Sequence, residues 1–330
     1  MKNWQETQEL VAELRTRLGR GESVAWATVV SIQGSTYRRP GAKLLMAADG
    51  TLAGNISGGC LEQDVRERAL EVLRAGQPAC VHYDTGDVED TLWGLGLGCN
   101  GQVDIFIQPV SPDTADWVEP LAQALDGNEA ITVCTDLAGD ASGQVRWARS
   151  GATDVTGLED GVFCERLEPP PVVWVCGAGD DAMPLVALLA STGFRVAVLD
   201  HRPAFLTSVR FPAARQLEAV RPAEWPGPPT GNPSALVVVK THTLQYDLEW
   251  VNQWIAAGAR YIGLLGPRAR RDEILAKVEP AQRDLVFGPA GLDLGGEGPE
   301  QVALSIVAEI LAVYHQRPGG HLRDRLGTIH

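Results

Sequence analysis

The feature that most constrains the fold is a glycine-rich turn between an apolar run and a helical stretch in the second half of the chain. The apolar run Val172–Cys176 leads into the turn Gly177–Ala182, whose sequence is G-A-G-D-D-A, and a helical pattern follows. A second apolar run, Arg195–Leu199, ends at Asp200. A strand, a G-x-G-x-x-A turn, a helix and a strand that ends in an acid form the βαβ unit of dinucleotide-binding domains. The pattern therefore predicts a Rossmann-like domain.

Strands and helices continue to alternate beyond this unit. Strand-like and helical stretches follow in the order 235–240, 244–257, 260–265, 268–277 and 285–288. Such alternation predicts a doubly wound parallel sheet. A last helix is expected over 299–315, and its polar stripe of Gln301, Ser305 and Glu309 is interpreted as the solvated face of an otherwise buried helix.

Ligands of such sheets bind outside the carboxyl ends of the strands. Gly177 and Gly179 would let the backbone approach a cofactor, Asp200 would bind a ribose, and His242 follows the end of another strand. These residues are candidate cofactor contacts, with a structural histidine as the alternative for His242. The acidic pair Asp180-Asp181 lies where a pyrophosphate would rest, and two carboxylates there would repel it, so the pattern favours the fold more than NAD(P) binding.

The first half of the chain has a different pattern. Helical stretches at 4–18 and 61–74 are mixed with strand-like runs at 25–32, 42–48, 103–110 and 130–134. The stiff run Pro169–Pro171 separates the halves, and 330 residues exceed one ordinary core. We expect an α/β protein with an N-terminal α+β domain over 1–168. A C-terminal Rossmann-like domain with a doubly wound parallel sheet should follow over 169–330.

Two cysteines in the first half are framed by glycines. Cys60 follows Gly58 and Gly59 at the start of a predicted helix, and Cys99 lies in a similar setting. Glycines allow close approach of a ligand, and a helix start can lower a thiol pKa, although Glu62 in the first turn partly cancels that effect. This predicts a site for a soft or anionic ligand. The alternative is that each cysteine is a small core residue at a tight turn.

A basic loop lies between two of these strand-like runs. Arg38 and Arg39 are adjacent and Lys43 follows shortly after them. Guanidinium groups can bind a phosphate or a carboxylate bidentately, so the loop is a candidate anion site. A solvated basic hairpin loop is the alternative.

Composition excludes several classes of function. The formal net charge is −14, which argues against nucleic acids and anionic membranes as partners. The six cysteines show no C-x-x-C pair and no zinc spacing, so no zinc site is predicted, and whether Cys60 or Cys99 contacts a metal stays open. No run is long enough to span a membrane, and we expect a cytoplasmic protein with reduced thiols. Cys80, Cys134 and Cys176 lie in apolar runs and are expected to be buried.

Taken together, these segments resemble the XdhC/CoxI family of accessory proteins for molybdenum hydroxylases, over nearly the whole chain. One difference is Asp180, which stands where the family turn commonly has histidine. The matching segments are GSTYRRPGAK (34–43), GNISGGCLE (54–62), GLGCNG (96–101), Gly177–Gly179, Asp200–Arg202, Thr241–His242, Gly263–Gly266, GPAGLD (288–293) and Pro299–Ile310.

The resemblance implies a chaperone rather than a conventional enzyme. Such a protein binds molybdenum cofactor (molybdopterin, bare or as a dinucleotide), protects it during sulfuration and inserts it into an apo molybdenum hydroxylase of the xanthine dehydrogenase type. A homodimer and a cysteine desulfurase-type sulfur donor are also implied. The cofactor would contact the loop of Arg38 and Arg39 and the glycine frames of Cys60 and Cys99. The alternatives are an NAD(P)-dependent oxidoreductase that uses His242 as acid or base, and a nucleotide-sensing regulatory protein.

Overall fold

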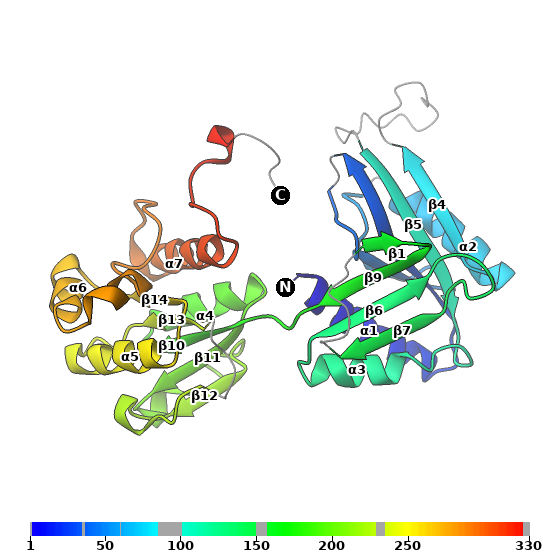
Figure 1. The fold of residues 1–330 in the computed structure, drawn as a ribbon. Coiled ribbons are helices and arrows are strands. Elements are labelled where there is room, and N and C mark those ends of the chain that lie inside the picture. Colours follow the sequence, from blue (N-terminus) through cyan, green and yellow to red (C-terminus); the bar gives the residue numbers. More distant parts are fainter. Residues whose placement is uncertain are drawn as a thin grey trace. The chain divides into compact units, whose positions relative to one another are not determined.

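The structure is a computed structural model that describes residues 2–34, 37–59, 61–84, 101–149, 157–228 and 235–325. The chain divides into two compact units, Met1–Pro169 and Pro170–His330. Figure 1 shows the ribbon, in which the first unit mixes helices with antiparallel strands and the second is built on a parallel sheet. The predicted α/β fold class, with an α+β part followed by a Rossmann-like part, is confirmed.

The N-terminal unit is built on a five-stranded sheet of order β3-β2-β1-β5-β4. The central pair is long: β1 runs antiparallel to β5 from Val24 opposite Val110 to Gly34 opposite Gly101. The strands are β1 (Val24–Gly34), β2 (Lys43–Ala47), β3 (Leu52–Gly54), β4 (Ala79–Asp84) and β5 (Gly101–Val110), and the helices are α1 (Lys2–Leu18), α2 (Glu62–Ala75) and α3 (Val118–Asp126).

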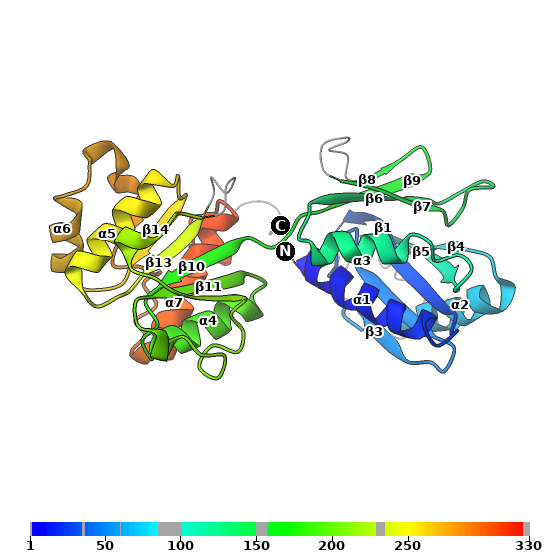
Figure 2. The ribbon, with the colours of Figure 1, turned by 90° about the horizontal axis from the view of Figure 1, so that it is seen from below.

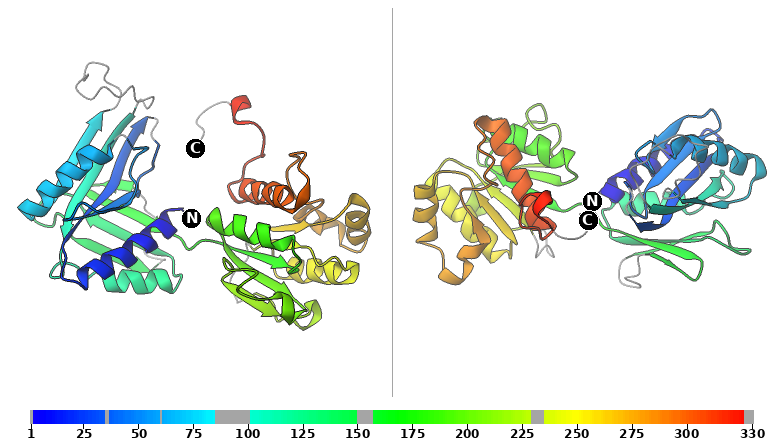
Figure 3. Two further views of the ribbon diagram at one scale, coloured as in Figure 1. Left: turned by 180° about the vertical axis from the view of Figure 1, so that it is seen from behind. Right: turned by 90° about the horizontal axis from the view of Figure 1, so that it is seen from above.

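Alternate side chains of β1 enter two different cores. Trp26 packs with α1 and α3 on one face of the sheet, whereas Ala27 and Val29 pack with α2 on the other. This follows from the period of two along a strand, which sends neighbouring side chains to opposite faces. The helices accordingly cover both faces of the sheet (Figure 2 and Figure 3).

A second, four-stranded sheet of order β7-β6-β9-β8 belongs to the same unit. Ile131 and Val133 of β6 and Leu167 of β9 join the core formed by α1 and α3. The strands are β6 (Ile131–Asp136), β7 (Val145–Arg149), β8 (Gly157–Glu159) and β9 (Val162–Leu167).

This second sheet overturns the expectation of reduced thiols. Cys134 and Cys164 lie directly opposite each other on β6 and β9, with 4.1 Å between their Cα atoms, and they form a disulfide. The prediction failed because sequence spacing does not reveal strand register. Cys176 is buried as expected, but Cys80 is exposed. Its strand β4 is half-buried, and alternation places this thiol on the solvated side.

The C-terminal unit is a six-stranded parallel sheet of order β12-β11-β10-β13-β14-β15. Its central strands are buried on both faces, as expected when helices cover both sides. Figure 2 shows α4 and α7 on one side of the sheet and α5 and α6 on the other. The elements are β10 (Val172–Cys176), α4 (Ala182–Ser191), β11 (Arg195–Asp200), β12 (Gln216–Ala219), β13 (Leu236–Val239), α5 (Leu244–Ala256), β14 (Tyr261–Leu264), α6 (Arg268–Leu275), β15 (Val286–Phe287) and α7 (Gly298–Tyr314).

The polar stripe of α7 does not simply face water. Glu309 accepts hydrogen bonds from the hydroxyl of Tyr261 (2.6 Å) and from the backbone N–H of Gly291 (3.0 Å). Ser305 donates its hydroxyl to the carbonyl oxygen of Leu292. The interpretation of this stripe as a solvated face was therefore wrong for Ser305 and Glu309, because both hold the loop that follows β15.

We predict that replacing both Cys134 and Cys164 by alanine lowers the free energy of unfolding of the oxidised protein by about 3–4 kcal/mol. The disulfide closes a loop with a sequence separation of 30. Closing a loop of that size lowers the conformational entropy of the unfolded chain, which stabilises the folded state by about this free energy. Urea denaturation without reductant measures the difference. Cys80→Ala is the matched control, since this thiol is exposed and should change little. Equal stability of wild type and double variant would show that the cross-link contributes nothing.

Candidate functional site

Three segments that are far apart in sequence meet at one end of the five-stranded sheet. The last residue of β1, Gly34, pairs with Gly101, the first residue of β5. Beyond β1, the ring of Tyr37, which is 69% exposed, lies 3.6 Å from where a Cβ on Gly58 would be. The basic loop and the glycine turn are thus adjacent. Cys60 and Cys99, the two predicted thiols, lie outside the described residues.

The two arginines of the basic loop have different environments. Arg38 is buried and its guanidinium pairs with both carboxylate oxygens of Glu6, one of them at 3.2 Å. Arg39 is exposed and makes no ion pair within the described part of the chain. Lys43 is buried, 2.6 Å from the carboxylate of Glu165. Arg39 is therefore the cation of this loop that can meet an external anion, while Arg38 and Lys43 anchor the loop.

The glycine turn before α2 is held by a pair of side chains. Glu62 accepts hydrogen bonds from the backbone N–H of Ser57 (3.0 Å) and from its hydroxyl. The same hydroxyl oxygen accepts the N–H groups of Gly59 (3.1 Å) and Leu61 (3.2 Å). Glu62, predicted as a cofactor contact, thus fixes the turn from within.

Position 59 favours glycine because of its backbone conformation, and it does not pack against other described residues. Its φ is 108°, a conformation that side chains disfavour, and among the described residues other than its chain neighbours no atom lies within 4 Å of a Cβ built on it. Gly58 beside it is also exposed. The turn is therefore preformed, with an open side on which a ligand could approach the backbone.

In the C-terminal unit, the first glycine of the G-x-G turn has a packing role. Gly177 has a φ of 123°, and a Cβ there would lie 2.4 Å from the carbonyl oxygen of Lys240. The ends of β10 and β13 approach each other closely at this point, which only glycine permits. A Cβ on Gly179 would instead lie 2.7 Å from a carboxylate oxygen of Asp181. Gly179 therefore leaves space that Asp181 fills.

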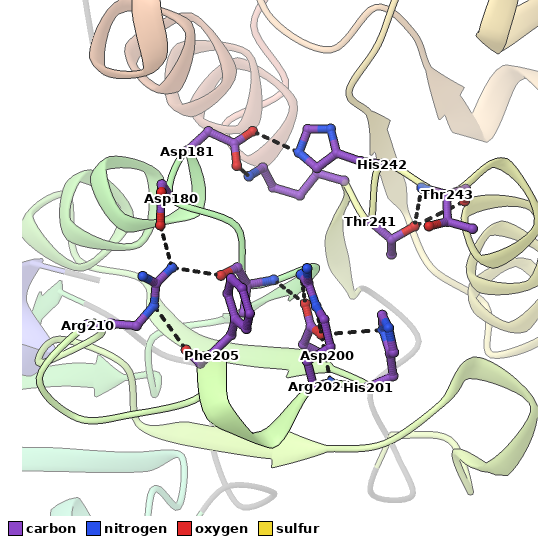
Figure 4. A network of polar contacts seen from close by, with 12 residues as sticks. Asp180, Asp181, Asp200, His201, Arg202, Phe205, Arg210, Thr241, His242 and Thr243 are labelled. Atoms are coloured by element: carbon purple, nitrogen blue, oxygen red, sulfur yellow. Dashed lines mark hydrogen bonds and ion pairs between the residues drawn. The ribbon is translucent and has the colours of Figure 1, made fainter.

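Both carboxylates of the turn are paired with cations (Figure 4). Asp181 Oδ1 lies 2.5 Å from Lys240 Nζ, and its other oxygen lies 3.3 Å from His242 Nε2. Asp180 pairs with Arg210 at 2.9 Å. Burial alone would raise the pKa of the Asp181 carboxyl, but these partners outweigh it and lower the pKa. Burial lowers the pKa of Lys240, against the effect of Asp181. The predicted repulsion of anions by these carboxylates is thus largely neutralised within the protein.

Asp200 is surrounded by donors from its own chain. Its carboxylate accepts the backbone N–H of Ala178 (2.7 Å), and the N–H, Nε and Nη2 of Arg202 (2.9 Å each). The guanidinium of Arg202 in turn lies 4.1 Å from the ring centre of Phe205. Despite burial, these bonds lower the pKa of Asp200. This geometry is that of a turn cap, and a ribose could reach the carboxylate only if Arg202 moved.

Three residues that the structure places in these sites were given no role in the prediction from sequence. They are the exposed Tyr37 beside the glycine turn, Lys240 at the end of β13 and Arg210 beside Asp180. A lysine directly after a wholly apolar strand was the available signal for Lys240. Among the described residues, no group of three or more His, Cys, Asp and Glu could hold a metal ion. Nor does the described part of the chain contain a helix with the length and apolarity to cross a bilayer.

Both units match models of one protein family. Residues 17–84 match the XdhC and CoxI family, and residues 173–310 match the XdhC Rossmann domain. The chain is 32% identical to a protein of Bacillus subtilis (strain 168) described as a probable subunit of xanthine dehydrogenase, covering 88% of this chain and 93% of that protein. It is 22% identical to the molybdenum cofactor insertion chaperone PaoD of Escherichia coli (strain K12), over 89% of this chain and 84% of that protein.

A solved structure is similar over the whole fold. A crystal structure described as a xanthine dehydrogenase from Bacillus halodurans aligns with a TM-score of 0.78 and 29% sequence identity. The alignment covers 93% of this chain and 96% of that one. Both units of the present fold therefore occur together in a related protein.

We predict that Asp200→Asn lowers the free energy of unfolding at pH 7 by about 1.5–3 kcal/mol, the range for hydrogen bonds to a charged group. The folded pKa of Asp200 lies below its ordinary value of 3.8. Its stabilisation is therefore complete above the unfolded pKa and is lost as the pH falls through the folded pKa. In the variant, the free energy of unfolding should lack this decrease at low pH, which denaturation curves recorded between pH 7 and 2 measure.

The matched control is Asp180→Asn, because that carboxylate is 88% exposed. It should leave stability nearly unchanged. The same pair of variants also tests the ribose assignment. If nucleotide affinity is the same in Asp200→Asn and wild type, Asp200 does not bind a ribose.

Proposed function

The chain belongs to the XdhC/CoxI family, and on that premise we propose that it is an accessory protein of a molybdenum hydroxylase. It binds molybdenum cofactor as cargo and inserts it into the apo-enzyme. Two relatives support this proposal by their own descriptions, one as a probable part of a xanthine dehydrogenase and one as a molybdenum cofactor insertion chaperone.

The observation that carries the proposal is the meeting of three family segments at one end of the five-stranded sheet. The pairing of Gly34 with Gly101 and the contact of Tyr37 with Gly58 bring together 34–43, 54–62 and the chain that enters β5. Cys60 lies one residue beyond Gly59. Cys99 lies two residues before Gly101 in the sequence, and both thiols lie outside the described residues.

The chemistry of this end fits the cargo. Molybdenum cofactor carries a phosphate and a dithiolene that holds the metal. Arg39 offers a guanidinium without an internal partner among the described residues, which suits the phosphate. Gly59 leaves its backbone open, and the bonds between Ser57 and Glu62 hold the turn in place before the cargo arrives. The thiols of Cys60 and Cys99 are the soft groups nearest in sequence.

The proposal extends to the steps that follow binding. The cofactor is protected while a cysteine desulfurase-type donor supplies its terminal sulfur, and a homodimer in the cytoplasm carries out the transfer. These features come from the family, and the bare and dinucleotide forms of the cofactor are both compatible with the loop of Arg39. Mass photometry of the purified protein tests the dimer, and reconstitution of an apo-hydroxylase tests the transfer.

We predict that the protein, purified from a host that makes molybdopterin, retains about one cofactor per chain and that Arg39→Ala lowers this retention several-fold. A charge-assisted hydrogen bond contributes about 1.5–3 kcal/mol, enough for a tenfold loss of affinity or more. Extraction of the oxidised, fluorescent pterin gives the amount bound. NAD(P)H-linked turnover without any retained pterin would contradict the proposed function.

Arg20→Ala is the matched control for Arg39→Ala. Arg20 is also exposed, but it precedes β1, whereas Arg39 follows it. The strand itself spans roughly 30 Å of extended chain between the two. Arg20→Ala should retain the cofactor as wild type does.

We also predict that Cys60→Ala and Cys99→Ala each weaken cofactor retention or transfer while thermal unfolding stays at the wild-type temperature. In the sequence both thiols are framed by glycines rather than by apolar runs, so we expect little loss of packing. Cys80→Ala, an exposed thiol on β4, serves as the control and should behave as wild type. Equal retention in all three variants would show that the glycine frames serve the fold alone.

A further inference from the structure

The aspartate at the start of α4 does not cap its helix. Asp181 is the N-cap residue, yet its side chain makes no capping hydrogen bond. Aspartate at this position usually accepts a backbone N–H of the first turn. Here the carboxylate turns away to Lys240 and His242. The backbone N–H groups of Ala182 and Met183 donate instead to the carbonyl oxygens of Gly179 (3.0 Å) and Asp180 (3.2 Å), and residue 184 is a proline without an N–H. The start of α4 therefore keeps the positive end of its dipole without a side-chain cap.

Lys240 supplies an independent observation at the same place. Its side chain is 1% exposed, and its ammonium group has the single ionic contact with Asp181. No other acceptor lies in hydrogen-bonding geometry within the described residues. An ammonium group has three donors, and burying donors without acceptors costs free energy. Such a group is expected where a further anion can reach it.

Both observations lie where an α/β sheet binds its ligands. The strand order is β12-β11-β10-β13-β14-β15. From β10 the chain adds strands first on one side (β11, β12) and then on the other (β13, β14, β15), and the ligand crevice of such a sheet opens between the two neighbouring strands β10 and β13. Lys240 and His242 follow β13, and the turn that ends in Asp181 follows β10. Gly179 has no side chain, so space remains between them, and the Asp181 carboxylate occupies it.

We propose that Lys240, His242 and the N-terminus of α4 form a binding site for a diphosphate group, and that the Asp181 carboxylate occupies this site as a built-in competitor. One carboxylate oxygen contacts Lys240 at 2.5 Å and the other contacts His242 at 3.3 Å. A diphosphate has oxygens for both contacts, and the dipole at the start of α4 favours its negative charge. The Asp181 side chain is 29% exposed, so it can turn toward solvent when the diphosphate enters.

This inference is independent of the cargo proposed above, because it concerns the C-terminal unit alone. It also accounts for a G-x-G turn that carries two acids. Asp180 is held by Arg210, whereas Asp181 competes directly with the ligand. The site binds weakly while Asp181 is in place and tightly when that charge is removed or drawn away.

The test is calorimetric titration of the full-length protein with inorganic pyrophosphate and, separately, with ADP. Asp181→Asn keeps the side-chain size but removes the competing charge, so it should bind pyrophosphate at least tenfold more tightly than wild type. Asp180→Asn is the matched control, since it removes an equal charge that is paired with Arg210, and it should bind within about threefold of wild type. The gain in pyrophosphate affinity of Asp181→Asn should shrink as the salt concentration rises, because salt screens the repulsion between the carboxylate and the ligand.

Two further variants locate the site. Lys240→Met placed in the Asp181→Asn protein should abolish the gain. Because Asp181→Asn leaves a buried ammonium without its partner, a variant that cannot disturb the core is also needed. His242 is 63% exposed, and His242→Ala in the otherwise wild-type chain should weaken pyrophosphate binding several-fold.

Three results would overturn the proposal. They are equal pyrophosphate affinity in wild type and Asp181→Asn, an equal gain in Asp180→Asn, and unchanged binding in His242→Ala. The two ligands distinguish the source of the diphosphate. Tighter binding of ADP than of pyrophosphate assigns the site to a nucleotide, and equal or weaker binding assigns it to free diphosphate.

Discussion

The antiparallel pairing of β1 with β5 is the interaction on which the N-terminal unit depends. It runs from Val24 opposite Val110 to Gly34 opposite Gly101, and it places alternate side chains of β1 in two separate cores. A slip of one residue would exchange the two sets of side chains, so the register is strongly fixed. The same register brings the loop after β1 beside the start of β5. The candidate cofactor site is therefore a consequence of core packing.

The two units treat charge in opposite ways at their candidate sites. In the N-terminal unit, Glu6 neutralises Arg38, and Arg39 is left for an external anion. In the C-terminal unit, Gly177 packs closely against the backbone of Lys240, which places the buried ammonium group of Lys240 beside the turn. The carboxylate of Asp181 neutralises that ammonium group from within the chain. Among the described residues, Arg39 has no internal partner at the first site, whereas Asp181 pairs with Lys240 at the second.

The fold could be predicted further than the sites because its signals are local. The G-x-G-x-x-A turn and the alternating apolar runs lie within short windows and gave the parallel sheet directly. The partners of charged and sulfur-containing side chains depend on residues far away in sequence. Glu165 lies 122 residues from Lys43, and the half-buried Cys134 meets its disulfide partner only through the register of β6 and β9. No local pattern carries that information, so the prediction of reduced thiols was wrong, and the internal partners of Arg38 and Lys43 in the basic loop were not predicted.

Hydrogen exchange measured by mass spectrometry tests the central claim most directly, namely that the cargo is held at one end of the five-stranded sheet. The full-length protein is compared with and without molybdenum cofactor. The account predicts slower exchange in peptides that cover 35–43 and 55–61, with exchange at 177–182 and 240–243 unchanged by the bare cofactor. Protection confined to the edge of the parallel sheet, with none in the two N-terminal segments, would contradict it.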